Sequence, residues 1–490
     1  MWVRGGRSEA TWSGHLLVVV ILLGFSLALQ FSTSSLGSVD GYFHARYASL
    51  VRQDGLLGFP PAFPWLPLTI LSADRYYDHH MLFHVLLAPF TSLGVVSGTK
   101  WASALFGAAA LAAVYAAMVR RGVERAGWWL LAMMALAPDF LYRMEMPRVQ
   151  AVSLVMLLLA IELLLSRRFT WLLPLATLYT WLYDAFPLLL MIAALVGLSM
   201  ALLEGRLEWR AVLYPLLGAA VGLLLNPYFP NNLWFIVHHY LGKVEIGTEM
   251  HLGTEWYPYP VAQWLGWGGA VAVLATAAIL TFRARRQLDE PTVAWLMIAA
   301  VFFVLVWRSR RFIEYAAPFI GIAVAMALHR WADAGVRRMS VSRRRALAAV
   351  LLAAFGVSTF VTVRQLRRRP GPDRYADGAA WLLEHTAPGA IVFTPNWDDF
   401  PLLFFHDQHN RYVVGLDPSY LAQRDAALYR LYQELGRGEV TPPSRFLPRF
   451  DAQVVLSDHS HDRFLAALGA DPEMERVYED GDCVIFRRRG

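Results

Sequence analysis

The chain has 490 residues, of which 57% are hydrophobic and only 17% are charged, and its formal net charge is +6. Soluble globular domains carry about 25% charged residues, so this composition excludes an ordinary soluble protein and indicates a membrane protein with many spans. The basic residues are scattered between apolar runs, which argues against nucleic-acid binding, and the single cysteine, Cys483, excludes an internal disulfide.

A series of apolar runs are candidate spans, because about 20 apolar residues cross a bilayer as a helix. The first run follows Arg4 and Arg7 and could be a signal peptide. No small-residue cleavage site stands out and further spans follow, so we interpret this run as a first membrane anchor. The candidate spans are residues 14–32, 79–97, 101–119, 126–140, 149–166, 169–183, 185–203, 211–226, 263–282, 292–307, 312–330 and 346–364.

The arginines set the expected orientation, since cytoplasmic loops are enriched in basic residues. With the N-terminus in the cytoplasm, the arginine-rich loops all fall inside if residues 79–97 dip into the membrane or lie at its outer surface without crossing it. This arrangement predicts about 11 transmembrane helices in the cell membrane and a C-terminus outside the cytoplasm. The segments expected on the outer face are 33–80, 139–148, 227–262 and 365–490.

The composition changes after the last candidate span, where short apolar stretches alternate with helical patterns. This alternation is typical of an α/β domain with a partly parallel sheet. We therefore expect a membrane domain, residues 1–364, that carries the outer loops and a small extracytoplasmic α/β domain, residues 365–490. Strands are expected at 390–394, 411–416, 451–458 and 482–489, and helices at 418–436 and 461–468.

The first outer segment contains Asp40, which lies just beyond the first candidate span. A carboxylate at this depth is costly unless it meets water, a cation or a metal. Asp40 could also cap the helix that the following residues predict. The two roles are compatible, and both stay open at this point.

A second cluster, ADRYYDHHMLFH at residues 73–84, combines aspartates with His79, His80 and His84. His80 and His84 are four residues apart and therefore share a helix face. Such a pair could bind a metal, bind phosphate or line a wet interface. The cluster contains no complete metal-binding motif.

Two further outer segments carry acids. Loop 139–148 holds Glu145 between two methionines, and an acid with apolar neighbours at membrane level needs a partner, although an ordinary polar connector is the alternative. Segment 227–262 holds Glu249 and Glu255 in a stretch rich in glycine and proline. This stretch could be a mobile loop that orders over a substrate or a solvated loop.

Arg308, Arg310 and Arg311 fall on the expected outer side, against the general trend of the basic residues. A lipid phosphate or pyrophosphate is a natural partner, because a guanidinium binds phosphate oxygens with two parallel hydrogen bonds. Pairing with the outer carboxylates is the alternative.

These segments together resemble the GT-C glycosyltransferases, and most closely the catalytic subunits of oligosaccharyltransferases. DGYFHARYASLVRQDG (40–55) resembles their first-loop motif, and YRMEMPR (142–148) resembles their second acidic motif. RRFIEYAAP (310–318) resembles their arginine–tyrosine–proline segment, and NWDDF (396–400) resembles their acceptor motif.

The match is incomplete in two of these motifs. Oligosaccharyltransferases usually have paired acids in the second motif, whereas this chain has Glu145 with Asp139 six residues earlier. The acceptor motif lacks one tryptophan and the tyrosine–glycine pair. We therefore carry over the type of reaction and not the acceptor.

The resemblance implies a GT-C fold and an enzyme that moves a sugar or oligosaccharide from a polyprenyl-phosphate or -pyrophosphate donor to a protein, glycan or lipid acceptor. The transfer would occur at the outer membrane face. A divalent cation, Mg²⁺ or Mn²⁺, is a further expectation, since such ions prefer oxygen ligands. The implied residues are Asp40 and Glu145 for catalysis; Arg310, Arg311, His79 and His80 for phosphate binding; Glu255, Trp397 and Asp398 on the acceptor side; and Asp40, Glu145 and Glu249 for the metal.

The main alternative is a multi-span transporter or a flippase for lipid-linked sugars. Transporters tend to show internal repeats and helices broken near the middle of the membrane. No repeat is evident in this sequence, and its acids, histidines and outer arginines gather on one expected face. This distribution favours an enzyme.

Overall fold

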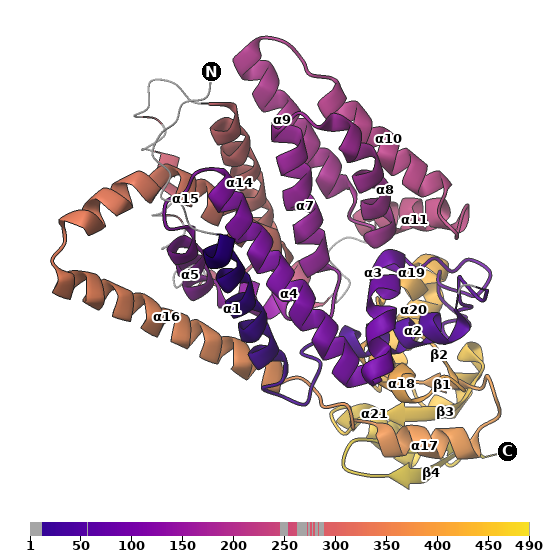
Figure 1. The fold of residues 1–490 in the computed structure, drawn as a ribbon. Helices are drawn as coiled ribbons and strands as arrows, with labels where there is room; N and C mark the ends of the chain where they lie inside the picture. The colour runs from indigo at the N-terminus through magenta and orange to yellow at the C-terminus, as the bar shows by residue number, and fades with distance from the viewer. Residues whose placement is uncertain are drawn as a thin grey trace.

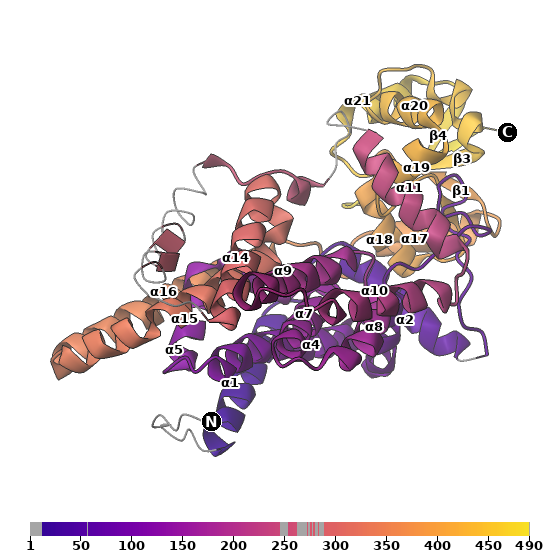
Figure 2. The same ribbon diagram turned by 90° about the horizontal axis from the view of Figure 1, so that it is seen from above.

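The computed structural model describes residues 12–55, 57–245, 253–261 and 289–489, with isolated positions between 272 and 283. Figures 1 and 2 show a bundle of long helices with a small mixed domain at one end. Six helices in the described ranges are long and apolar enough to cross a membrane, so the chain is a multi-pass membrane protein. They are α1 (Trp12–Gln30), α4 (Val95–Arg120), α9 (Pro187–Glu204), α14 (Glu290–Arg308), α15 (Ile313–Arg338) and α16 (Val341–Arg367).

Shorter apolar helices complete the bundle and correspond to other candidate spans. The expected total of about 11 crossings stays a prediction, and the candidate span 263–282 lies largely outside the described residues. These shorter helices are α5 (Ala126–Leu136), α7 (Gln150–Leu165), α8 (Leu172–Leu182) and α10 (Arg210–Leu224). The seven-residue helix α6 (Pro138–Met144) instead lies mostly in the segment 139–148, which was expected as a loop.

The helices pack in pairs through their apolar faces, with α4 against α1 and α7, α14 against α15, and α8 against α10. Small residues allow the last pair to approach closely, as is common between membrane helices. A Cβ atom on Gly218 of α10 would lie 2.3 Å from the carbonyl oxygen of Leu173 on α8. A larger residue at this position would therefore push the two helices apart.

The candidate span 79–97 forms no single long helix. It folds as the short helix α3 (Met81–Leu87) followed by the 3₁₀ helix η1 (Ala88–Leu93), and α4 begins directly afterwards. At about 1.5 Å per residue these two segments are too short to cross a bilayer. They pack against α2 (Asp40–Asp54), so residues 81–93 form one unit with the segment after the first span, and their placement on the outer face stays a prediction.

The start of α2 corrects one interpretation of Asp40. The N-cap residue is Val39, no side chain caps the helix, and Asp40 is the first helical residue. Its carboxylate is therefore free of a capping role and faces the cavity described below.

The C-terminal domain contains a five-stranded sheet with the strand order β2-β1-β3-β5-β4. The strands β2, β1 and β3 are parallel, whereas β5 is antiparallel to both β3 and β4. The partly parallel sheet was expected, but β4 was not. The strands are β1 (Ile391–Phe393), β2 (Arg411–Tyr412), β3 (Ala452–Ser457), β4 (Met474–Glu479) and β5 (Val484–Arg488).

Helices flank this sheet and connect its strands. The single helix expected at 418–436 is divided at Asp425, whose carboxylate accepts hydrogen bonds from the amides of Ala427 and Leu428 and so caps the second half. The helices are α17 (Ala376–His385), α18 (Phe400–His406), α19 (Ser419–Arg424), α20 (Ala426–Gly436) and α21 (Asp462–Ala470).

The first outer segment and the C-terminal domain share one hydrophobic core. Helix α18 packs on α2, and aromatic side chains from both regions, including Tyr42, Phe63 and Phe404, belong to the same buried cluster. Backbone hydrogen bonds join the two regions as well, because the Tyr412 amide donates to the carbonyl oxygen of Trp65 at 2.8 Å. This shared core fixes the C-terminal domain over one end of the helical bundle.

Candidate active site

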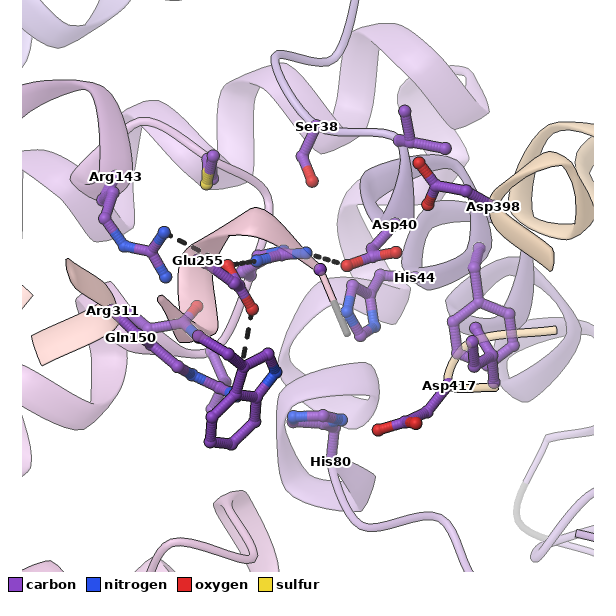
Figure 3. Close-up of a pocket in the computed structure, with 18 of the residues that line it drawn as sticks. Ser38, Asp40, His44, His80, Arg143, Gln150, Glu255, Arg311, Asp398 and Asp417 are labelled. Atoms are coloured by element: carbon purple, nitrogen blue, oxygen red, sulfur yellow. Dashed lines mark hydrogen bonds and ion pairs between the residues drawn. The ribbon is translucent and has the colours of Figure 1, made fainter. Parts of the chain in front are cut away.

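A cavity of about 680 Å³ lies where the helical bundle, the first outer segment and the C-terminal domain meet. Figure 3 shows that its walls differ in charge: Arg143 and Arg311 lie on one side, and Asp40, Asp398 and Asp417 lie on the other. Most of the residues expected at the site line this cavity. They are Asp40, His79, His80, Glu255, Arg310, Arg311, Trp397 and Asp398.

Three arginines form the basic wall, and we call Arg143, Arg148 and Arg311 the arginine cluster. All three guanidiniums approach the carboxylate of Glu255, at 3.2 Å for Arg143, 3.0 Å for Arg148 and 3.9 Å for Arg311. Arg143 also pairs with Glu314 of α15 at 2.7 Å. The cluster therefore concentrates positive charge around one carboxylate.

Glu255 was expected on the acceptor side, but the structure places its carboxylate within the arginine cluster (Figure 3). Burial alone would raise the pKa of Glu255, but the charges of Arg148, Arg311 and Arg143 outweigh this effect and hold the pKa well below its usual range. The side chain is thus an anion at neutral pH. It occupies the position at which three guanidiniums could bind another anion.

The cluster has more donors than Glu255 can satisfy. Among the described residues, the Nη2 atom of Arg143 is buried and has no hydrogen-bond partner. A buried donor without a partner costs about 1–3 kcal/mol. A ligand with more acceptor oxygens than a carboxylate, such as a phosphate, would satisfy more of these donors.

Arg310 and Arg311 are neighbours but have different environments. Arg311 donates to the Tyr183 hydroxyl at 2.8 Å and stacks over the ring of Trp256 with 4.8 Å between the guanidinium carbon and the ring centroid. Arg310 instead donates to the carbonyl oxygens of Tyr257 at 3.2 Å and Pro258 at 3.5 Å. Of the two, Arg311 is the better placed for an anion in the cavity.

The acidic wall comes from α2 and from the C-terminal domain. Asp40 lies at the start of α2 and pairs with Arg148. Asp398 lies in the 3₁₀ helix η7 (Trp397–Asp399), and burial raises its pKa while the charges of Arg148 and Arg369 oppose that shift. These two carboxylates lie opposite Arg143 and Arg311 in the cavity, which the half-buried Trp397 also lines.

Both histidines expected to bind phosphate line the cavity. The His80 ring stacks on Tyr183 with 5.6 Å between centroids, so the same tyrosine contacts His80 and Arg311. Burial lowers the pKa of His80 well below its usual value, and the neighbouring His79 adds to this effect. His80 is therefore a neutral ring at physiological pH, which can hydrogen-bond an anion but adds no charge.

Glu145 is not among the cavity residues, which corrects its expected place beside Asp40. Its side chain is fully buried against α1, where it accepts hydrogen bonds from Ser26 at 2.7 Å and Gln30 at 2.8 Å. The sequence correctly indicates that this acid needs a partner. The partners are neutral side chains of α1, and Glu145 does not line the cavity that Asp40 lines.

The described residues do not fit the expected Mg²⁺ or Mn²⁺ site. Asp40 pairs with Arg148, Glu145 is turned toward α1, and Glu249 lies outside the described residues. In the described ranges no group of three or more histidine, cysteine, aspartate or glutamate side chains is arranged to hold a metal ion. The guanidinium of Arg148 therefore contacts Asp40 at the place where the resemblance implies a metal ion.

Several residues that line the cavity were not predicted from the sequence to belong to the site. Arg143 and Arg148 were assigned only to a polar loop, although they lie on the expected outer face against the positive-inside trend, which is the signal that identified Arg311. His44 follows Asp40 by four residues and therefore shares its helix face. No comparable signal identifies Asp417, which lies in a loop of the C-terminal domain.

Comparisons with known proteins support the fold. No protein-family model and no curated protein matches the chain. Its structure matches the apo oligosaccharyltransferase of Archaeoglobus fulgidus with a TM-score of 0.64 and 15% identity, over 92% of this chain and 70% of that one. It also matches ArnT of Cupriavidus metallidurans, bound to undecaprenyl phosphate, with a TM-score of 0.60 and 18% identity, over 97% of this chain and 98% of that one.

The oligosaccharyltransferase AglB of the same archaeon, in complex with an inhibitory peptide and a dolichol-phosphate, matches with a TM-score of 0.60 and 17% identity over 91% of this chain and 70% of that one. This chain thus spans about 70% of the length of these oligosaccharyltransferases, whereas ArnT is matched over almost its full length. At this level of identity the likeness concerns the fold. This chain has the GT-C fold, as its resemblance to that superfamily predicts.

Proposed function

We propose that the chain is a GT-C-type glycosyltransferase that moves a sugar or oligosaccharide from a polyprenyl-phosphate or -pyrophosphate donor to an acceptor at the extracytoplasmic face. The observation that carries this proposal is the arginine cluster in one cavity with Asp40, where Arg148 contacts both Asp40 and Glu255. The structurally similar ArnT and AglB were solved with polyprenyl phosphates, which supports a donor of this class.

The donor phosphate would bind the arginine cluster and displace the carboxylate of Glu255. A phosphate offers more oxygens and more charge than a carboxylate, so it satisfies more of the guanidinium donors, including Nη2 of Arg143. The polyprenyl tail would lie along the apolar helices. His79 and His80, at the edge of the cavity, would hydrogen-bond the phosphate or the sugar.

Transfer passes through a transition state in which the sugar resembles an oxocarbenium ion and the leaving phosphate gathers negative charge. Fixed guanidiniums in a buried site stabilise that charge without reorganisation. When the phosphate engages Arg148, Asp40 loses part of its ion pair and becomes able to orient the acceptor. Asp398 and Trp397 complete the acceptor side of the cavity.

The test is transfer of radiolabel from a mixed pool of polyprenyl-linked sugars to membrane acceptors by purified protein in nanodiscs. Arg148→Gln removes one guanidinium of the cluster and should lower kcat/KM by about 100-fold or more. Arg476→Gln is the matched control, because Arg476 pairs with Glu479 on the exposed surface of the C-terminal domain. The control should retain wild-type activity.

The transporter alternative makes a different prediction for the same preparation. A flippase would move the labelled lipid across reconstituted vesicles without changing it chemically. Label that crosses the bilayer while remaining on its lipid, with no transfer to any acceptor, would contradict the proposed enzyme.

A further inference from the structure

A chain of buried hydrogen bonds leads from Asp78 through His84 to His44 at the cavity wall. The Oδ2 atom of Asp78 lies 2.7 Å from Nδ1 of His84, and Nε2 of His84 lies 2.8 Å from Nδ1 of His44. Asp78 and His84 are buried, and His44 lines the cavity. Figure 3 shows the His44 ring directly below Asp40 on the same face of α2.

The three residues of this hydrogen-bonded chain come from elements that are separate in the sequence. His44 comes from α2, His84 from α3, and Asp78 from the segment before α3, where its other oxygen accepts a hydrogen bond from the amide of His80 at 3.0 Å. The ring of Tyr47 packs against His84 with 4.9 Å between centroids. Aromatic walls of this kind keep water from competing for the hydrogen bonds.

The hydrogen bonds determine which ring nitrogens carry protons. Asp78 as a carboxylate only accepts, so Nδ1 of His84 donates to it. In a neutral His84 the Nε2 atom then accepts, and Nδ1 of His44 must donate to it. A neutral His44 consequently has its lone pair on Nε2, on the side of the ring away from His84.

We propose that His44 is the general base of the glycosyl transfer and that His84 and Asp78 are positioning residues that store the proton it receives. This inference rests on the proposed function. Asp40, one helical turn before His44, would orient the acceptor, and Nε2 of His44 would take its proton.

The proton balance closes without any additional reactant. The acceptor O–H or N–H gives its proton to Nε2 of His44, and His44 passes its Nδ1 proton to Nε2 of His84. The acceptor electron pair forms the new bond to the anomeric carbon. The bond from that carbon to the phosphate oxygen breaks and leaves its electron pair on the phosphate. The result is an imidazolium at His84 beside the carboxylate of Asp78, and the proton returns to water through His44 after product release.

The surroundings of His44 determine the expected pH dependence. Burial lowers the pKa of His44 well below its usual value, and the nearby His84 and His79 lower it further. His44 is therefore neutral and able to accept a proton at physiological pH, and the reaction slows only when acid protonates it. The titratable groups that face it are Asp40 on α2, Asp78, His79 and His80 on the segment before α3, and His84 on α3.

The experiment is a single-turnover transfer assay of wild type and Asp78→Asn as a function of pH, from about pH 3.5 to 9, so that the range includes the acid limb expected for a histidine of lowered pKa. The amide oxygen of asparagine can still accept from His84, but it cannot stabilise an imidazolium. We expect the plateau rate to fall by about 10- to 100-fold and the acid limb of the profile to move to lower pH. The affinity for undecaprenyl phosphate should stay within about twofold of wild type, because the arginine cluster is intact.

Asp74→Asn is the matched control, because Asp74 is an exposed acid in the same segment. It should leave both the rate and the pH profile unchanged. His84→Gln provides a second disruption of the same chain and should lower the plateau in the same way. Asp78→Asn could fold poorly, which loss of undecaprenyl-phosphate binding would reveal. In that case His84→Gln and His44→Gln test the proposal, and both should lower the plateau rate.

The outcomes separate the two proposals. Wild-type transfer with an unchanged acid limb in Asp78→Asn and His84→Gln would overturn the histidine chain and leave the proposed function intact. A lower rate without movement of the acid limb would show a structural role only and would also overturn it. Absence of transfer by wild type from every lipid-linked donor would instead overturn the proposed function.

Discussion

The guanidinium of Arg148 pairs with the carboxylate of Asp40 across 108 positions of the sequence. The same guanidinium also contacts Glu255, so Arg148 lies between the acidic wall of the cavity and the carboxylate within the arginine cluster. A donor phosphate that binds Arg148 must therefore change the electrostatic environment of Asp40. Under the proposed function, donor binding and preparation of the acceptor side would be coupled through this one residue.

Replacement of Arg311 tests the basic wall from the side of the 3₁₀ helix η6 (Arg310–Phe312), which directly precedes α15. Arg311→Gln should weaken binding of undecaprenyl phosphate by about 10- to 100-fold, because a charge-assisted hydrogen bond contributes about 1.5–3 kcal/mol. Arg310→Gln is an informative companion, since the Arg310 guanidinium is directed at carbonyl oxygens. Isothermal titration should show the larger loss for Arg311→Gln, and equal losses would contradict the assignment of the two arginines.

Glu255→Gln removes the internal competitor of the donor phosphate. We expect the variant to bind undecaprenyl phosphate about tenfold more tightly, because the arginine cluster no longer has to release a carboxylate. The free protein should be less stable, since the buried guanidiniums lose a counter-charge, and the donor should raise its Tm by more than it raises that of wild type. Weaker donor binding in Glu255→Gln would show that this carboxylate does not occupy the phosphate position.

Glu145→Gln distinguishes a packing role from a catalytic one. The glutamine keeps the shape of the side chain and can still accept a hydrogen bond from Ser26 or Gln30, which are the observed partners. Transfer should stay within about threefold of wild type, because Glu145 does not line the cavity. A loss of activity as large as that expected for Arg148→Gln would contradict the packing role and indicate that Glu145 takes part in catalysis.

Asp399 gives the stability of the C-terminal domain a defined pH dependence. Burial raises the pKa of Asp399 to about 7, and its Oδ1 atom accepts a hydrogen bond from Tyr375 at 2.9 Å. Between the unfolded value near 4 and the folded value near 7, the folded protein binds more protons than the unfolded chain, so stability falls as pH rises through this window. Above this pH window Asp399 is ionised in both states, and burial of its charge destabilises the folded protein by the full amount.

Asp399→Asn should abolish this pH dependence and stabilise the protein above about pH 7 by an amount on the order of 1–3 kcal/mol. Asp377→Asn is the control, since Asp377 is exposed in the first turn of α17. Thermal unfolding in detergent at about pH 5 and pH 8 measures the effect. A wild-type Tm that rises with pH over this interval would contradict the buried-acid account.

Much of the fold was predictable because it depends on local pattern. Apolar runs predict the helices, and alternating apolar stretches predict four of the five strands. The strand β4 was missed because its sequence, MERVYE, is half charged, and only Met474 of its residues is fully buried. The sharing of one core between residues 33–80 and the C-terminal domain depends on contacts between distant segments, for which no local signal exists.

The site was predictable only in part, because it too depends on contacts between segments that are distant in the sequence. Asp40 and Arg311 are charged residues at unusual depths, which a single sequence reveals. The place of Glu255 depends on three arginines from two other segments, and the seclusion of Glu145 depends on polar residues of α1. Charge alone identifies residues that need partners, but tertiary structure decides which partners they receive.

Asp40→Asn provides the most direct test of the account. The variant and wild type would be purified in nanodiscs and supplied with radiolabelled polyprenyl-linked sugars and membrane acceptors, and both transfer and undecaprenyl-phosphate binding would be measured. We predict that wild type transfers label, that Asp40→Asn loses at least about 1,000-fold in rate, and that the variant still binds the lipid phosphate. An Asp40→Asn protein that transfers label at the wild-type rate would contradict the central claim.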